Sequence, residues 1–171
     1  MKDNAEIAIL AGGCGWIMQQ LLRGCDGVVS TRVGWIGGES DDPTEESPGG
    51  HAEAVEVSFD AQRISYRELL EYFFQTHRPD LDESLVGSIY RSEIFYTSDE
   101  QRTVAEETIL DVDASGHWPG KTVTRVSEAG PFLEAAAEDQ DYFQRYPDGF
   151  PSPFPRRGAE AANRETASSL R

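Results

Sequence analysis

The chain has 171 residues, 38% of them hydrophobic, which is enough for one domain with a buried core. Its 31 acidic and 15 basic residues give a formal charge of -16, which disfavours nucleic acid and membrane partners. There is neither an apolar run long enough to cross a bilayer nor a secretory leader, and there are only two cysteines, so we expect a cytoplasmic protein.

The N-terminal third predicts a strand, a glycine turn and a helix, followed by a second strand. Residues 6–11 form a short apolar run that ends at Gly12-Gly13, and apolar residues recur at helical spacing over 16–22. Residues 28–36 predict the second strand, and an acidic, proline-containing loop follows over 39–50.

A third strand is predicted over residues 51–59, where side chains alternate between two faces. One face carries His51, Glu53, Val55, Val57 and Phe59. The pattern therefore directs the Glu53 carboxyl toward an apolar interior.

The remaining elements alternate between helix and strand. A capping box at residues 65–68 begins a helix that we expect to end near residue 76, a strand follows over 92–96, a helix from 99 to about 110, and a strand over 121–126. This order predicts an α/β (α+β) fold around one mixed sheet. We expect a domain over residues 1–146 and a mobile tail over 147–171, which is rich in Pro, Gly, Ala and Ser.

The stretch "AGGCGW" places Cys14 at the predicted strand-to-helix turn. Unpaired N–H groups and the dipole at a helix N-terminus favour negative charge, so a thiol there should have a lowered pKa and be nucleophilic. Glu53, if buried, should have a raised pKa and act as a general acid. His51, on the same face, either tunes Glu53 or caps the preceding loop, and we favour the cap.

Cofactor sites are not indicated by the spacing of potential ligands. Neither Cys14 and Cys25 nor the three histidines show the paired spacing of a zinc site, and no phosphate-binding glycine motif is present. We expect no bound metal or nucleotide.

With these residues identified, the chain resembles the peptide methionine sulfoxide reductase A family. The matching blocks are "AGGCGW", "GVVSTRVGWIGG", "GHAEAVEVSFD", "ISYRELLEYFFQTHRP" and "GSIYRSEIFYTSDEQ", in the family's order over residues 7–142. The resemblance implies a split βαβ, ferredoxin-like core and a peptide-methionine (S)-S-oxide reductase-like oxidoreductase.

The resemblance also implies a role for each residue that it matches. Cys14 would attack the sulfoxide sulfur and remain as a sulfenic acid, and Glu53 would protonate the departing oxygen. Tyr90 would hydrogen-bond that oxygen, and Trp16 would form part of the wall around the methyl group on sulfur.

The departures from the family pattern are concentrated in the substrate pocket. Gly15 stands where the family has Phe, Trp35 where it has Tyr, Leu85 where it has Asp and Ile89 where it has Gln. Near the C-terminus, Glu138 and Asp139 replace a Tyr-His pair. We therefore count Gly15, Trp16, Trp35, Leu85 and His51 as substrate-binding candidates and expect a remodelled pocket, suited to methionine sulfoxide or to a specialised sulfur compound.

Cys25 lies beyond the predicted helix that begins after Cys14, too far for a disulfide, and the tail has no cysteine. We therefore expect an external thiol reductant, thioredoxin or a small thiol. Two alternatives remain open: a cysteine-dependent enzyme on this fold without net redox change, and a non-catalytic module that binds a ligand or peptide.

Overall fold

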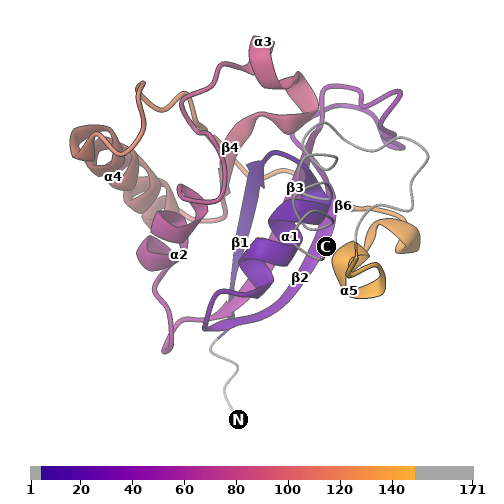
Figure 1. Ribbon diagram of the computed structural model, residues 1–171, viewed down its shortest axis with the longest axis horizontal. Coiled ribbons are helices and arrows are strands. Elements are labelled where there is room, and N and C mark those ends of the chain that lie inside the picture. Colours follow the sequence, from indigo (N-terminus) through magenta and orange to yellow (C-terminus); the bar gives the residue numbers. More distant parts are fainter. Residues whose placement is uncertain (1–4, 149–171) are drawn as a thin grey trace, which may run out of the picture.

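The computed structural model describes residues 5–148, which form one mixed sheet with helices packed against it (Figure 1). The strand order is β5-β4-β1-β3-β2-β6. The strands are β1 (Ala5–Gly12), β2 (Val28–Ile36), β3 (Ala52–Asp60), β4 (Ser92–Tyr96), β5 (Arg125–Glu128) and β6 (Leu133–Glu134). The helices are α1 (Gly15–Arg23), α2 (Tyr66–Phe73), α3 (Glu83–Val86), α4 (Asp99–Ser115) and α5 (Tyr142–Arg145), with 3-10 turns η1 (Ser88–Tyr90) and η2 (Ala137–Asp139).

The four central strands confirm the predicted ferredoxin-like core. Their order is β4-β1-β3-β2, and each is antiparallel to its neighbours. Helix α1 connects β1 to β2 and helix α2 connects β3 to β4, so each crossover passes over one intervening strand, which is the split βαβ arrangement. Strand β5 adds a parallel edge after α4.

The two faces of the sheet have separate apolar cores. The larger core packs α1, α2 and α4 against the sheet through residues such as Leu22, Leu70 and Ala105, and it includes Val55 and Val57 of β3. The second core lies on the opposite face and includes Ile9, Ile36 and Phe95, with Ala129 and Phe132 packed over it. The predicted alternation of β3 is confirmed, because Val55, Val57 and Phe59 all lie in the helix-covered core.

The predicted strand over residues 121–126 is wrong for most of its length, because β5 begins at Arg125. Long-range contacts take the hydrogen bonds that a strand would need. The Thr122 N–H donates to the Asp113 carboxylate at 2.7 Å, and the Val123 N–H donates to the Pro79 carbonyl at 2.8 Å. The segment is therefore held as a loop.

Two predicted helix ends also move. Helix α2 ends at Phe73. Its last carbonyls, those of Tyr72 and Phe73, accept hydrogen bonds from turn N–H groups, and the His77 ring also lies within hydrogen-bond distance of the Phe73 carbonyl. Helix α4 continues past Leu110 to Ser115 and ends at Gly116, whose φ of 66° provides the left-handed cap.

Most of the predicted tail, residues 149–171, lies outside the described residues. Within residues 5–148, no helix is both long and apolar enough to span a membrane.

Candidate active site

Cys14 lies where β1 turns into α1, as the glycine pattern predicts. Gly13 has a φ of 107°, a left-handed conformation that favours glycine, and it turns the chain out of the sheet. Cys14 is the N-cap residue, and its carbonyl accepts the first helical hydrogen bond from the Met18 N–H at 2.9 Å. Its side chain caps no backbone group of α1 and is partly exposed, so the thiol lies at the positive end of the helix dipole.

The Glu53 carboxyl reaches the same turn from β3. Glu53 is only 5% exposed and shares its face of the strand with Val55. A Cβ atom placed on Gly15 would lie 3.6 Å from Glu53 Oε1 and 2.7 Å from Cγ1 of Val33. The residue next to Cys14 therefore packs directly against the buried carboxyl and against Val33.

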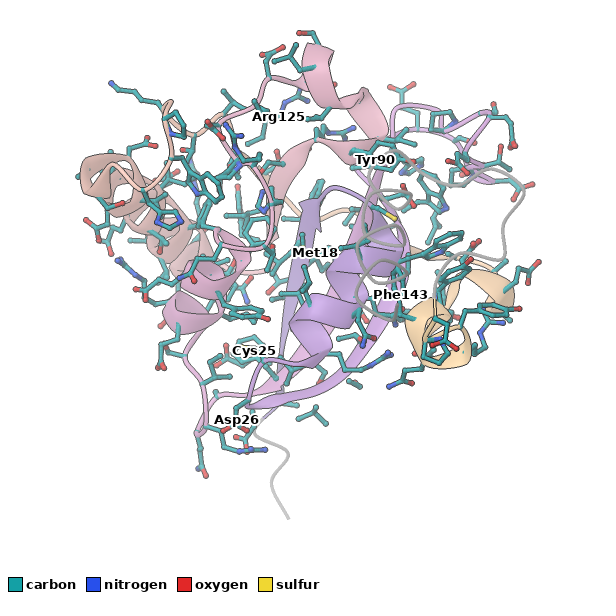
Figure 2. The ribbon with its side chains drawn as sticks, in the orientation of Figure 1. Met18, Cys25, Asp26, Tyr90, Arg125 and Phe143 are labelled. Carbon is teal, nitrogen blue, oxygen red and sulfur yellow. The ribbon has the colours of Figure 1, made fainter. Side chains whose placement is uncertain are left out.

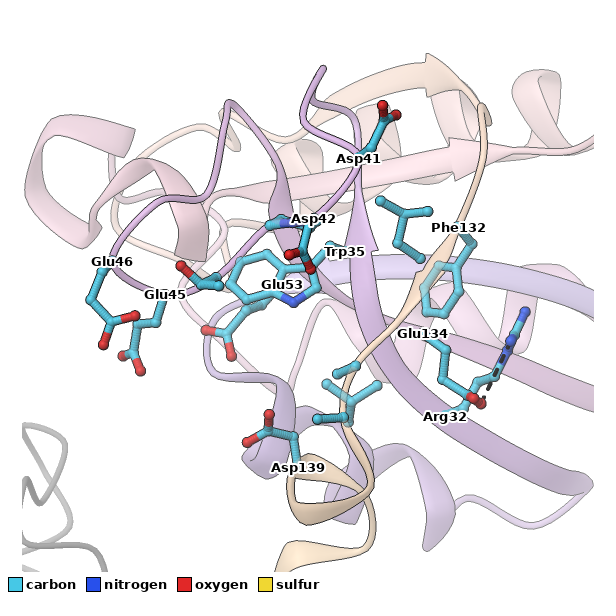
Figure 3. Close-up of a pocket in the computed structure, with 16 residues that line it drawn as sticks. Arg32, Trp35, Asp41, Asp42, Glu45, Glu46, Glu53, Phe132, Glu134 and Asp139 are labelled. Atoms are coloured by element: carbon cyan, nitrogen blue, oxygen red, sulfur yellow. Dashed lines mark ion pairs between the residues drawn. The ribbon is translucent and has the colours of Figure 1, made fainter.

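Trp35 is paired across the strands with Glu53, so the two side chains lie on the same face. Both line an open cleft of about 730 Å³ (Figure 3). Its walls are formed by β2, by the loop between β2 and β3, and by the segment that contains β6 and η2. The acidic side chains that line it are Asp41, Asp42, Glu45, Glu46, Glu53, Glu134 and Asp139.

Tyr90 approaches the cleft from η1. Its hydroxyl donates a hydrogen bond to Glu45 Oε1 at 3.2 Å. Figure 2 shows Tyr90 at the end of the molecule where α1 begins. Neither Tyr90 nor Leu85 is among the residues that line the cleft, and Leu85 is 72% exposed on α3.

His51 is buried and holds the loop between β2 and β3. Its Nδ1 accepts a hydrogen bond from the Gly38 N–H at 3.0 Å, and its Nε2 lies 2.8 Å from the Ser40 carbonyl, to which it donates in that tautomer. Both ring nitrogens are thus bonded to the backbone. This is the loop-capping role favoured above, and it leaves neither ring nitrogen for a substrate.

Gln140 and Tyr142, in the C-terminal segment that packs beside α1, are not among the residues predicted from the sequence. Gln140 accepts from the Val33 N–H at 2.8 Å and donates to the Val33 carbonyl at 2.7 Å, in the manner of a strand neighbour. Tyr142 follows and stacks on Trp16, with ring centroids 3.7 Å apart. The signal was the "QDY" that directly follows Glu138 and Asp139, the two residues compared above with the family pattern.

Cys25 lies beyond the C-terminal end of α1, at the opposite end from Cys14 (Figure 2). Cys14 and Cys25 are not joined by a disulfide. Burial, assisted by the negative charges of Asp26 and Glu68, raises the pKa of the Cys25 thiol. Cys25 is therefore too far from Cys14 to form a disulfide with it, and its raised pKa disfavours the thiolate that such a reaction needs.

The described part of the chain contains no group of three or more His, Cys, Asp or Glu side chains arranged to hold a metal ion. Asp and Glu residues gather around the cleft, but they come from separate segments and are not brought together as ligands.

The fold and the site define a two-layer ferredoxin-like protein with a cysteine at a helix N-terminus next to a buried carboxyl. The family model for peptide methionine sulfoxide reductase matches residues 6–169. A peptide methionine sulfoxide reductase of Mesorhizobium japonicum is 54% identical over 99% of this chain and 100% of its own length. The chain belongs to the peptide methionine sulfoxide reductase family.

Solved structures agree with this assignment. Mxr1 from Saccharomyces cerevisiae in reduced form has a TM-score of 0.78 and 26% identity, covering 88% of this chain and 90% of that chain. Mxr1 in complex with Trx2 has a TM-score of 0.60 and 26% identity, covering 81% of this chain and 85% of that chain.

Proposed function

We propose that this protein reduces methionine sulfoxide to methionine, with Cys14 as the nucleophile and Glu53 as the proton donor. The observation that carries the proposal is the proximity of the two groups: the residue after Cys14 packs against the Glu53 carboxyl. Glu53 is buried, and burial disfavours the charged carboxylate, so the group can supply a proton.

The reaction proceeds in two stages. The Cys14 thiolate attacks the sulfoxide sulfur, the oxygen accepts the proton of Glu53, the thioether leaves, and the oxygen remains on Cys14 as a sulfenic acid. An external dithiol then reduces the sulfenic acid, releasing water and becoming a disulfide. Tyr90 donates a hydrogen bond to the sulfoxide oxygen, and Trp16 and Trp35 contact the groups on sulfur.

The pocket accepts methionine sulfoxide in a peptide or a related sulfoxide of different shape. Its open mouth supports the broader substrate range. Leu85 has no role in this proposal, since it is exposed on α3.

We also propose a thioredoxin-type protein or a small thiol as the reductant, with no bound cofactor. The complex of Mxr1 with Trx2 supports the first choice. Sparse cysteine use supports the cytoplasm as the compartment. We further propose that residues 1–146 form the reductase domain.

The test is steady-state reduction of methionine sulfoxide in a tripeptide and as the free amino acid, with dithiothreitol as reductant. Cys14→Ala should abolish turnover, and Glu53→Gln should slow it about 10²- to 10⁴-fold. Equal rates for the wild type and both variants would overturn the assignment. Turnover of an electrophile without any reductant would instead favour the non-redox alternative.

A further inference from the structure

The guanidinium of Arg91 is buried beside η1. Arg91 directly follows η1 and is 5% exposed, and its Nε donates to Glu93 Oε1 at 2.7 Å. Glu93 is 4% exposed, and its Oε2 accepts a hydrogen bond from the Ser127 hydroxyl at 2.7 Å. This buried pair is thereby tied to β4 and β5.

The other Arg91 nitrogens bond to backbone outside these strands. One terminal nitrogen donates to the Ser88 carbonyl in η1 at 3.0 Å, and the other donates to the Gly50 carbonyl at 3.1 Å. A Cβ atom on Gly37 would lie 3.0 Å from that second nitrogen, so the end of β2 packs directly on the guanidinium.

These contacts join the segments that carry three of the proposed site residues. Tyr90 lies in η1. Glu53 lies in β3, which begins shortly after Gly50, and Trp35 lies in β2, which ends directly before Gly37. The sheet does not make the connection from η1 to β3, because β3 is paired with β1 and β2 and not with β4. The Arg91 side chain bridges that gap.

A buried cation is costly unless its donors are satisfied, and the planar fork of arginine fixes the directions of its hydrogen bonds. The backbone segments bonded to it are therefore held at a set separation. We propose that Arg91, held by Glu93, is a positioning residue that sets the Tyr90 hydroxyl relative to the Glu53 carboxyl, an inference that rests on the proposed function.

The first experiment combines kinetics with hydrogen exchange on the full chain. Arg91→Lys keeps the charge but loses the planar guanidinium that bonds to the Ser88 and Gly50 carbonyls. Amide exchange should therefore accelerate at residues 37–51 and 87–91. On methionine sulfoxide, kcat should fall about 10- to 100-fold while KM changes less than about threefold. Glu93→Gln, which keeps the shape of the partner, should give a smaller change in the same direction and serves if Arg91→Lys does not fold.

The matched control is Phe59→Leu, a core substitution at the far end of β3. It should lower global stability without accelerating exchange at 37–51 and without changing kcat. If Arg91→Lys and Phe59→Leu have the same effects on exchange at residues 37–51 and on kcat, Arg91 is only a structural residue and the proposal is wrong.

A double-mutant cycle tests whether Arg91 acts through Tyr90. Tyr90→Phe alone should lower kcat, and adding Arg91→Lys should then cost less than about threefold. Fully additive losses would overturn the positioning role. A wild-type protein that reduces no sulfoxide would overturn the proposed function, and the exchange data would still decide whether Arg91 holds the three segments.

Discussion

Gly15 is the residue at which the nucleophile turn, the carboxyl and the core meet. The Val33 side chain occupies the space into which a side chain at position 15 would first extend. A phenylalanine there would rebuild the aromatic wall that the sequence analysis found missing, but it first requires a smaller residue at position 33. A substitution at position 15 is thus coupled to the packing of Val33.

This coupling predicts a stability effect for the smallest substitution. Gly15→Ala should lower the free energy of unfolding by about 1 to 3 kcal/mol, because its Cβ overlaps Val33, and Gly15→Ala with Val33→Ala should cost less than the sum of the two. Urea denaturation measures both. Gly24→Ala is the control, because its Cβ would meet nothing closer than 3.4 Å. Equal stability of Gly15→Ala and Gly24→Ala would contradict the overlap.

His77 is a neutral histidine at the end of α2. Its Nδ1 lies 2.9 Å from the Phe73 carbonyl and its Nε2 lies 2.8 Å from the Ser92 hydroxyl, and the Phe73 ring packs against it. Burial lowers the pKa of His77 from 6.5 to about 4, against the opposing effect of the Phe73 carbonyl. The unfolded chain therefore takes up a proton at a higher pH than the folded chain does.

The consequence is a pH-dependent stability. The His77 contribution should be fully present above about pH 6.5 and should be lost as the pH falls toward 4, by about 2 to 3 kcal/mol in total. Urea unfolding at intervals from pH 5 to 7.5 measures the slope. His77→Gln should flatten it, whereas His117→Gln, at an exposed position, should leave it unchanged. The same slope in both variants would show that His77 is not the group responsible.

At the scale of elements, the C-terminal segment is attached to the sheet by side chains more than by strand pairing. Strand β6 contributes only Leu133 and Glu134 to the ladder with β2, and Gln140 continues the edge through its amide. The Asp141 N–H, at a residue with a φ of 53°, then donates a hydrogen bond to Gln19 Oε1 at 3.0 Å, and the Asp141 carboxylate pairs with Arg23. These contacts place Tyr142 against Trp16.

Removing the Gln140 amide should therefore release the segment. Gln140→Ala should accelerate amide exchange over residues 136–146 and lower stability by about 1 to 3 kcal/mol, because the Val33 N–H loses its acceptor and the Val33 carbonyl keeps only the Ala135 N–H. Gln144→Ala, at an exposed position of α5, is the control. If residues 136–146 exchange no faster in Gln140→Ala than in Gln144→Ala, the Gln140 amide does not hold the segment.

At the scale of the whole molecule, the two cysteines lie at opposite ends of α1. Its nine residues span about 14 Å, whereas a disulfide requires Cα atoms within about 7 Å. The chain has no third cysteine. Oxidation at Cys14 cannot be resolved within the folded protein.

A single turnover without reductant should therefore yield one methionine per chain and leave one added oxygen on the protein, without loss of two hydrogens. Intact-mass analysis after mixing with methionine sulfoxide measures this. Cys25→Ser should give the same product and the same steady-state rate with dithiothreitol. An internal disulfide in the wild type that is absent from Cys25→Ser would show that α1 unwinds during the reaction.

The sheet topology also brings the candidate residues to the same end of the core strands. Strands β1 and β2 end there, and β3 and β4 begin there, because each neighbouring pair in the core is antiparallel. Cys14 follows β1, Trp35 lies near the end of β2, Glu53 lies near the start of β3, and Tyr90 precedes β4. Residues far apart in sequence thus gather at one end of the core strands, where Trp35 and Glu53 line the cleft.

The sequence by itself determined the strand, turn and helix around Cys14, the inward-facing side of β3 and the α/β (α+β) class, because these depend on short-range periodicity and on glycine. The ferredoxin-like core was implied by the family resemblance. The tertiary structure alone decided that Glu53 packs beside Gly15 and that Leu85 lies outside the cleft. It also decided that Arg91 bonds to backbone around the site, whereas the loop-capping role of His51 was already favoured from the sequence. Those features depend on contacts between distant segments, for which neither periodicity nor spacing carries information.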